Sequence, residues 1–296
     1  MDSPRTLHEY VPGQPHWWQW LTVLSLDAPL VAVAWQLAMA RVAQVTLRGH
    51  HAFILGAAVW LAYAADRWIE GWRIDPAQLR TQRHWFYQYW RWPVAAIWVI
   101  VLLVSLVLSF AFLTRPELSA GLLLLAPVLI YLLSHQLIHR HRRWRAPKEA
   151  CVGLLFGIGV ACFPLANNPA ALVRLAPLLV LFALLCFADC ALISLWEDEV
   201  DRTHGQTSFA LQFPQGQRFI RSLPWVIAAL AAASAMAMQG RGPLREMTAC
   251  AAISGVLLGS LDLAHRRLGR QLSRALVDLT LITPLPFLLS TQFLSP

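Results

Sequence analysis

Two pairs of carboxylates with the same spacing are the residues of this sequence best suited to chemistry. Asp66 and Glu70 form one pair, and Glu197 and Asp201 form the other. Residues four apart on a helix share one face, so each pair sets two carboxylates one turn apart. Such carboxylates repel unless a cation lies between them, and Mg2+ is commonly held by one or two carboxylates together with water and substrate phosphates. The spacing therefore predicts catalytic and metal-binding roles for these four acids, with Mg2+ on a diphosphate.

An arginine directly follows one acid of each pair. Arg67 comes after Asp66, and Arg202 comes after Asp201. A guanidinium there either pairs with the neighbouring acids or binds a phosphate. The alternative interpretation is a set of solvated ion pairs at two helix ends. The matching spacing, together with the predicted position of both pairs at the same depth on the same side of a membrane, favours a joint site.

The composition indicates the elements that must position these residues. Hydrophobic residues make up 57% of the 296 residues and charged residues 14%, whereas soluble domains average about 45–50% and about 25%. The excess recurs along the whole chain, which excludes an ordinary soluble enzyme and a disordered protein. Five cysteines, an odd number within apolar stretches, argue against a disulfide scaffold.

Nine stretches are long and apolar enough to cross a bilayer, which takes about 20 residues per helix. They predict an all-α polytopic bundle of nine transmembrane helices, forming one integral membrane domain over residues 1–296. Asp66 and Glu70 end the second stretch, and Glu197 and Asp201 end the sixth. The expected spans are residues 20–44, 51–72, 93–113, 118–138, 149–168, 171–196, 219–238, 244–264 and 272–293.

The distribution of positive charge predicts the orientation in the membrane. With nine spans, 18 of the 24 Lys and Arg residues fall on the N-terminal side and 6 on the other. The positive-inside rule then places the N-terminus and the four acids at the cytoplasmic face, as in a bacterial inner membrane. The net charge of +8 is attributed to topology and anionic lipid headgroups, so no nucleic-acid partner is expected.

Other polar residues are weaker candidates. Asp189 lies within the sixth span, two turns before Glu197, where it either orients an acceptor and takes its proton or makes an interhelical hydrogen bond. Three histidines have metal-like spacing, but the arginines around them disfavour zinc. The basic run that contains them, residues 139–145, is interpreted as a headgroup-binding loop and part of a diphosphate entrance, which includes Arg145. These histidines are His135, His139 and His141.

At the acid pairs the sequence resembles the UbiA superfamily of intramembrane prenyltransferases. That family has nine transmembrane helices and two Asp-rich motifs near the cytoplasmic ends of helices 2 and 6. Its second motif reads D-x-x-x-D-x-x-x-G. Here the stretch from Glu197 to Gly205 reads E-D-E-V-D-R-T-H-G, with Glu in place of the first Asp.

The first motif departs further from the family pattern. The family reads N-D-x-x-D-x-x-x-D, and residues 62–70 read A-Y-A-A-D-R-W-I-E. Asp66 is kept, Glu70 replaces an Asp, and Ala62 and Tyr63 replace the Asn and the leading Asp. Fewer oxygen ligands remain on that side.

The resemblance implies an Mg2+-dependent transfer of an isoprenoid from a prenyl diphosphate to an aromatic or other small acceptor, next to the lipid bilayer. It implies that Lys148, in the run Arg145-Ala-Pro-Lys148-Glu149, binds the diphosphate together with Arg202, Arg67 and Arg145. Two alternatives stay open. One is a terpene cyclase that ionises the same substrate, and the other is a non-catalytic homologue that binds a lipid.

Overall fold

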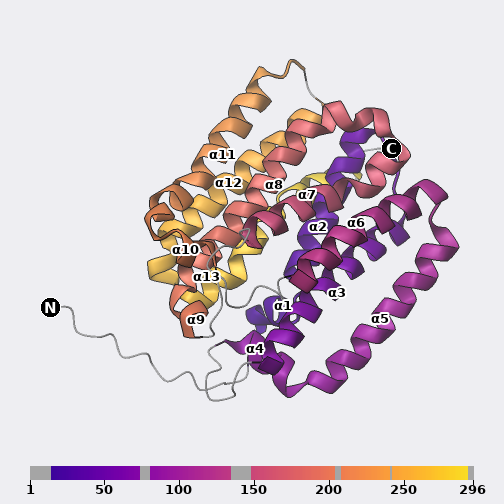
Figure 1. Cartoon of the computed structure of the whole chain (residues 1–296). Helices are drawn as coiled ribbons and strands as arrows, with labels where there is room; N and C mark the ends of the chain where they lie inside the picture. The colour runs from indigo at the N-terminus through magenta and orange to yellow at the C-terminus, as the bar shows by residue number, and fades with distance from the viewer. Residues whose placement is uncertain (1–14, 74–80, 135–147, 204–207, 241, 293–296) are drawn as a thin grey trace.

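In the computed structural model, the described residues are 15–73, 81–134, 148–203, 208–240 and 242–292. All elements within these ranges are helices (Figure 1). In chain order they are η1 (Trp17–Gln19), α1 (Trp20–Val23), α2 (Asp27–Ala43), α3 (Gly49–Arg73), α4 (Gln82–Tyr89), α5 (Arg91–Phe112), α6 (Arg115–Leu133), α7 (Lys148–Asn167), η4 (Pro169–Ala171), α8 (Leu172–Trp196), α9 (Asp198–Thr203), α10 (Phe209–Gln212), η5 (Pro214–Gly216), α11 (Gln217–Ala237), α12 (Pro243–Leu268), α13 (Arg270–Val277), η6 (Asp278–Leu281) and α14 (Pro284–Gln292).

The predicted polytopic helical bundle is confirmed. Within the described residues, 8 helical segments are long and apolar enough to cross a membrane, and a bent pair brings the number to 9. The bent pair corrects the first predicted span, because residues 20–44 are not one helix. The α1 and α2 axes meet at 74°, since the backbone turns left-handed at Ser25 (φ 57°). The break places Asp27 in the first turn of α2, where a carboxylate is stabilised by the helix dipole.

Large side chains from three helical segments close the centre of the bundle. The Trp35 ring of α2 is fully buried and stacks on Phe182 of α8 with ring centroids 4.5 Å apart. Its indole N–H donates a hydrogen bond of 2.7 Å to the carbonyl of Leu281, at the end of η6. This contact satisfies the indole, whose burial would otherwise be costly. It also joins the first, sixth and last spans at one point.

Small residues let neighbouring helices approach closely. A Cβ added to Gly153 of α7 would lie 2.6 Å from the backbone oxygen of Ala183 in α8. A Cβ added to Gly255 of α12 would lie 2.8 Å from the backbone oxygen of Pro224 in α11. Small residues at such contacts are typical of helix packing in membranes. The α7–α8 contact fixes how the N-terminus of α7 lies against the end of α8, where the acids are.

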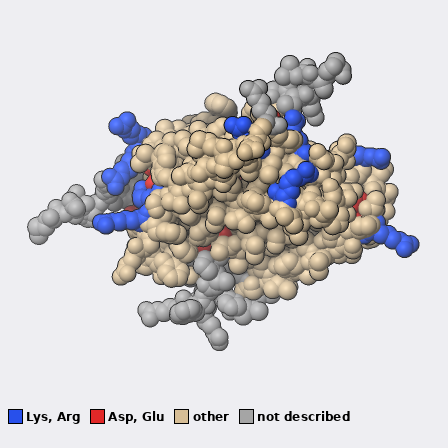
Figure 2. Space-filling model, turned by 90° about the horizontal axis from the view of Figure 1, so that it is seen from above, with Lys and Arg blue, Asp and Glu red and all other residues tan. Residues whose placement is uncertain are grey.

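The outer helices present apolar side chains to their surroundings. Only 6% of the span in α6 and 11% of that in α5 is buried, against 56% in α12. Figure 2 shows a surface that is mostly neither basic nor acidic, with blue Lys and Arg side chains at both ends and a few on the face between them, and few red acids visible. An apolar belt of this kind matches a bilayer as solvent. The acids are mostly inside the bundle, so they need partners there.

Substituting Gly255 tests the close helix contact away from the acids. We expect Gly255→Ala to lower the stability of the purified protein by about 1–3 kcal/mol, because the new methyl group must push backbone atoms apart. Thermal unfolding in detergent measures this. The matched control is Gly121→Ala in α6, where a Cβ meets nothing within 4 Å. Equal stability of both variants would contradict the packing argument.

Candidate functional site

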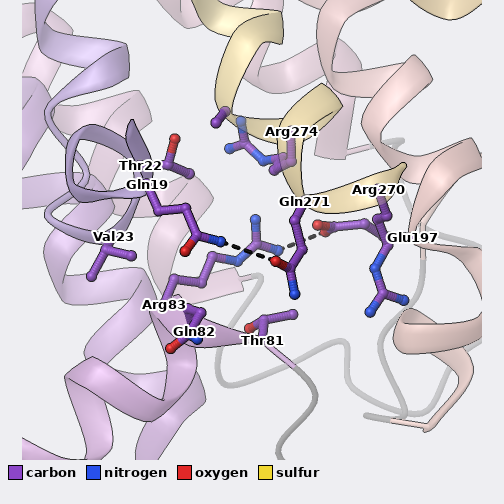
Figure 3. Close-up of a pocket in the computed structure, with 11 residues that line it drawn as sticks. Gln19, Thr22, Val23, Thr81, Gln82, Arg83, Glu197, Arg270, Gln271 and Arg274 are labelled. Atoms are coloured by element: carbon purple, nitrogen blue, oxygen red, sulfur yellow. Dashed lines mark hydrogen bonds and ion pairs between the residues drawn. The ribbon is translucent and has the colours of Figure 1, made fainter. Parts of the chain in front are cut away.

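The short helix α4 connects the two acid pairs through consecutive residues. The Arg83 guanidinium donates from Nη2 to Glu197 Oε2 at 2.7 Å. The His84 imidazole places Nε2 at 3.1 Å from Glu70 Oε2. The first contact joins residues 114 positions apart in the sequence, and the second joins residues 14 positions apart. Both contacts lie at one end of the bundle. Figure 3 shows the Arg83–Glu197 ion pair, and Figure 1 places α4, α9 and α13 at that end.

Both ring nitrogens of His84 have a fixed partner. Thr81 precedes α4 as its N-cap, and its Oγ1 lies 2.7 Å from His84 Nδ1. The histidine is 1% exposed, and this burial, together with the charge of Arg83, lowers its pKa to about 4 despite the opposing effect of Glu70. The ring is therefore neutral at pH 7. A neutral ring suits this setting, because it accepts the Thr81 hydroxyl at Nδ1 and donates from Nε2 to Glu70.

The second acid pair follows the end of α8. Glu197 is the C-cap of α8, and its carbonyl accepts a 2.8 Å hydrogen bond from the backbone N–H of Asp201. The predicted four-residue helical step is therefore kept across the junction. Each acid is 5% exposed. Burial raises the pKa of Glu197, but the positive charges of Arg83, Arg274 and Arg67 outweigh it and bring the pKa to about 2.

Asp201 has less compensation for its burial. Burial raises its pKa to about 6, the charge of Lys148 opposes the rise, and the neighbouring Glu197 adds to it. A buried carboxylate with a raised pKa attracts a further cation. Of the second pair, Asp201 is therefore the acid whose environment better suits an added positive charge.

Lys148 lies between the two acid pairs. As the first residue of α7, it interacts electrostatically with Asp201, Glu70 and Asp66. The next residue, Glu149, is 2% exposed and accepts a 2.9 Å hydrogen bond from the backbone N–H of Phe209. That bond ties the start of α7 to α10. The predicted diphosphate-binding lysine is thus placed among the predicted metal-binding acids.

Magnesium fits this donor set in part. Carboxylates are the ligands that it prefers, and the raised pKa of Asp201 marks a place for a cation. Glu70 and Glu197, in contrast, are already bonded to His84 and Arg83. Among the described residues, no three Asp, Glu, His or Cys side chains gather closely enough to hold a metal ion. A metal would therefore take part of its ligands from substrate phosphates.

The two arginines that follow the acids lie differently. Arg202 is bonded to Asp198, one turn earlier in α9, at 3.0 Å, and its side chain is 67% exposed, so the structure does not bring it among the acids. Arg67 is partly buried and interacts electrostatically with Glu70 and Glu197. The predicted Arg145 and the three histidines of residues 135–141 lie outside the described residues. Tyr63, in place of the family's Asp, packs edge-on against Phe156 of α7.

A second group of charges lies deeper in the bundle. Asp189 is 4% exposed, and its Oδ1 has no hydrogen-bond partner among the described residues. It interacts electrostatically with Asp278, Arg274 and Asp27. Arg274 bonds Asp278, one turn later, and lies 3.9 Å from Asp27. At 1.5 Å per residue, Asp189 is about 12 Å along the helix from Glu197.

Sequence reasoning missed Arg83, His84 and Arg274 as parts of this region. Arg274 carried a usable signal, because Arg274 and Asp278 have the four-residue spacing of a helical ion pair. Arg83 and His84 carried none that pointed to the acids, since their partners come from other helices.

Comparison with solved structures identifies the fold. No protein-family model matches the sequence, and neither does any curated protein. The structure resembles the apo structure of a UbiA homolog from Aeropyrum pernix K1, with a TM-score of 0.58 and 17% sequence identity. The match covers 90% of this chain and 98% of that chain. The protein is therefore a polytopic integral membrane protein with the fold of that UbiA homolog, and the predicted resemblance is confirmed for the fold.

The environment of His84 predicts a pH dependence of stability. Its pKa falls from 6.5 to about 4 on folding, so the folded state binds this proton less readily than the unfolded state. The stabilisation is complete above pH 6.5 and is lost as pH falls from there toward 4. At pH 5 the loss should be about 2 kcal/mol. Thermal unfolding at pH 7 and pH 5 measures it. His84→Gln should show a smaller loss, and an unchanged pH dependence in that variant would contradict the assignment.

Proposed function

We propose that this protein is an Mg2+-dependent intramembrane prenyltransferase, which transfers an isoprenoid from a prenyl diphosphate to an aromatic or other small acceptor. One observation carries the proposal. Acids from the end of α3 and from the α8–α9 junction meet around Arg83 and Lys148 at one end of an apolar bundle. Cations and carboxylates in one buried place suit a diphosphate with its metal, and apolar helices suit its hydrocarbon tail. The fold of a UbiA homolog supports the same class.

The diphosphate oxygens would contact Lys148, Arg83 and Arg67, whose side chains come from three different helices. These cations stabilise the negative charge that grows on the leaving group as the C–O bond breaks. When bound, Mg2+ would be held by Asp201 and Asp66 with help from Glu70 and Glu197, and it would neutralise further charge on the diphosphate. Arg202 and Arg145 remain proposed contacts from the sequence alone, and Arg202 is exposed and paired with Asp198.

Bond cleavage leaves both electrons of the C–O bond on the diphosphate and an allylic cation on the isoprenoid. Tyr63 of α3 lies one turn deeper than Asp66, and Phe156 of α7 lies two turns from Lys148. Their edge-to-face pair, with ring centroids 6.0 Å apart, provides an aromatic wall that keeps water away and stabilises a cation. The acceptor then forms the new bond and loses a proton. Asp189, with its unpartnered oxygen, is the proposed proton acceptor.

The location follows from the same proposal and the charge bias of the sequence. We place the acid end of the bundle at the cytoplasmic face of a bacterial inner membrane, because 18 of the 24 Lys and Arg residues fall on that side. A water-soluble diphosphate headgroup would then bind at the aqueous face while its tail lies between the helices.

Asp201→Asn tests the proposed chemistry against a matched control. Purified protein in detergent is given isoprenyl diphosphates of several lengths, with Mg2+ and then with chelator, and diphosphate release is measured. We expect Asp201→Asn to lower release by about 100-fold or more, as is typical when a charge-stabilising group is removed. The control is Asp198→Asn in the same short helix, whose partner is the exposed Arg202, and it should keep nearly full activity.

The organic product then separates the candidate reactions. A product that carries the acceptor indicates a transferase, and a cyclised hydrocarbon or alcohol indicates a terpene cyclase. Absence of both release and substrate binding, at every chain length, would contradict the proposal and favour a non-catalytic homologue. Full activity of Asp201→Asn would show that the acid assignment is wrong even if release occurs.

A further inference from the structure

The outer seam between α11 and α12 has a fixed register. The Arg221 guanidinium of α11 donates from Nη1 to both carboxylate oxygens of Asp262 in α12, at 3.1 Å each. One turn further along the seam, the Trp225 ring lies over Gly259, where an added Cβ would be 2.5 Å from the ring. Residue numbers thus rise along α11 as they fall along α12, so the helices are antiparallel. Figure 1 shows the two helices side by side.

The register brings three arginines together where the seam ends. Arg218 lies one turn before Arg221, and Arg266 lies one turn after Asp262, so Arg218 and Arg266 stand level on neighbouring helices. Both are exposed, and neither forms an ion pair with any described residue. The α11 sequence contains no acid, and the other acid of α12, Glu246, lies in its first turn, at the opposite end. Positive charge therefore exceeds negative charge at this end of the seam.

Helix dipoles explain only half of this arrangement. Arg266 lies in the last turn of α12, where a positive charge is favourable. Arg218 has the opposite setting, because it is the second residue of α11, and a positive charge near a helix N-terminus is unfavourable. No acid in the first turn of α11 offsets it. An external anion beside Arg218 would do so, since both the guanidinium and the helix N-terminus attract negative charge.

The guanidinium of Arg221 is held in place and still open to the outside. Asp262 is 4% exposed and also accepts a 2.9 Å hydrogen bond from the indole N–H of Trp196, the residue before Glu197. This bond places the seam at the acid end of the bundle and fixes the carboxylate that holds Arg221. The Arg221 side chain is 45% exposed, and the ion pair uses only Nη1. A ligand that binds its remaining nitrogens meets a side chain that is already oriented, which lowers the entropy cost of binding.

Apolar side chains continue the seam away from the arginines. Trp225 is 39% exposed, and Leu263, directly after Asp262, is 73% exposed. Val256 lies two turns from Leu263 on the same flank of α12 and is 44% exposed. Tryptophan is enriched at the level of lipid headgroups, and aliphatic side chains suit acyl chains. The seam thus presents cations, then an aromatic ring, then an apolar strip, which is the order of phosphate, glycerol esters and acyl chains in a phospholipid.

We infer that the arginine end of this seam binds the headgroup of an anionic phospholipid. The phosphate oxygens would contact Arg218, Arg221 and Arg266, and the acyl chains would lie along Trp225 and Leu263. Basic side chains at the membrane surface attract anionic lipids, and the bilayer supplies such lipids at this depth. The inference does not depend on prenyl transfer, because none of these side chains belongs to the acid pairs or to the proposed diphosphate contacts.

Lipid binding by the full chain in detergent, with EDTA, tests the inference. Dioleoyl phosphatidylglycerol is titrated, and native mass spectrometry counts the lipids bound per chain. We expect one saturable site in the wild type and about 30-fold weaker binding in the double variant Arg218→Gln with Arg266→Gln, since each arginine contributes about fivefold. Both residues are exposed, so the variant should fold, which thermal unfolding checks. Arg221 is kept, because its loss would leave the buried Asp262 without its cation.

A matched variant and a second lipid make the outcome specific. The double variant Arg115→Gln with Arg174→Gln removes two exposed arginines at the starts of α6 and α8, at the opposite end of the bundle, and it should bind like the wild type. Dioleoyl phosphatidylcholine has the same acyl chains without net charge, and it should bind the wild type no better than phosphatidylglycerol binds the seam variant. Equal affinity for the two lipids, an unchanged affinity in the seam variant, or the same loss in both double variants would overturn the inference.

Inorganic phosphate distinguishes a lipid from a free anion. It is added as a competitor, with potassium chloride at the same ionic strength as the reference. Phosphatidylglycerol binding should be the same in both salts, because the acyl chains add affinity that free phosphate lacks. Displacement of the lipid by phosphate but not by chloride would mean that the seam recognises a free anion, and the lipid assignment would be wrong.

Discussion

Burial of charge in an apolar bundle is the constraint on which this structure depends. A charge out of water is costly unless it is paired and hydrogen-bonded, and the cost is greatest where lipid surrounds the protein. Glu70, Glu197 and Asp278 each have a nitrogen partner within hydrogen-bond distance. The partners come from α4 and α13, which lie at one end of the bundle. Because Arg83 and His84 both belong to α4, satisfying Glu197 and Glu70 helps to hold that short helix against the ends of α8 and α3. The Arg274–Asp278 pair, in contrast, is local to one segment.

Helix packing sets the position of the charges in turn. The contact at Gly153 holds α7 against α8 so closely that even one methyl group would meet the backbone of Ala183. Lys148 begins α7, and Glu197 follows α8, so this contact sets the distance between the lysine and the second acid pair. The hydrogen bond from Phe209 to Glu149 fixes the same end from the other side. The geometry of the site thus depends on the small volume of Gly153, which lies between one and two turns from Lys148 along α7.

Sequence reasoning could reach the features that depend on local pattern. Span length follows from bilayer thickness, and the shared face of Asp66 and Glu70 follows from the helical period. The bend after α1 was not predicted, although Asp27 and Pro29, residue types typical of a helix's first turn, mark the start of α2 in the sequence. The left-handed conformation of Ser25 itself gave no such signal. The contacts of Arg83 and His84 were hidden for a different reason. Their partners are fixed by the tertiary packing of α3, α4 and α8. Arg202 pairs with Asp198 one turn earlier, a contact that the four-residue helical spacing already favours.

The same ion pairs constrain how any diphosphate can bind. Arg83 and Lys148 already interact with acids of the two pairs, so an incoming anion must share or replace those carboxylates. Carboxylates that lose a cation to the anion would then need another positive charge, since two acids one turn apart repel. Anion and metal are therefore expected to bind together, each reducing the electrostatic cost of the other. The raised pKa of Asp201 marks where this coupling begins, because its burial is the least compensated of the second pair.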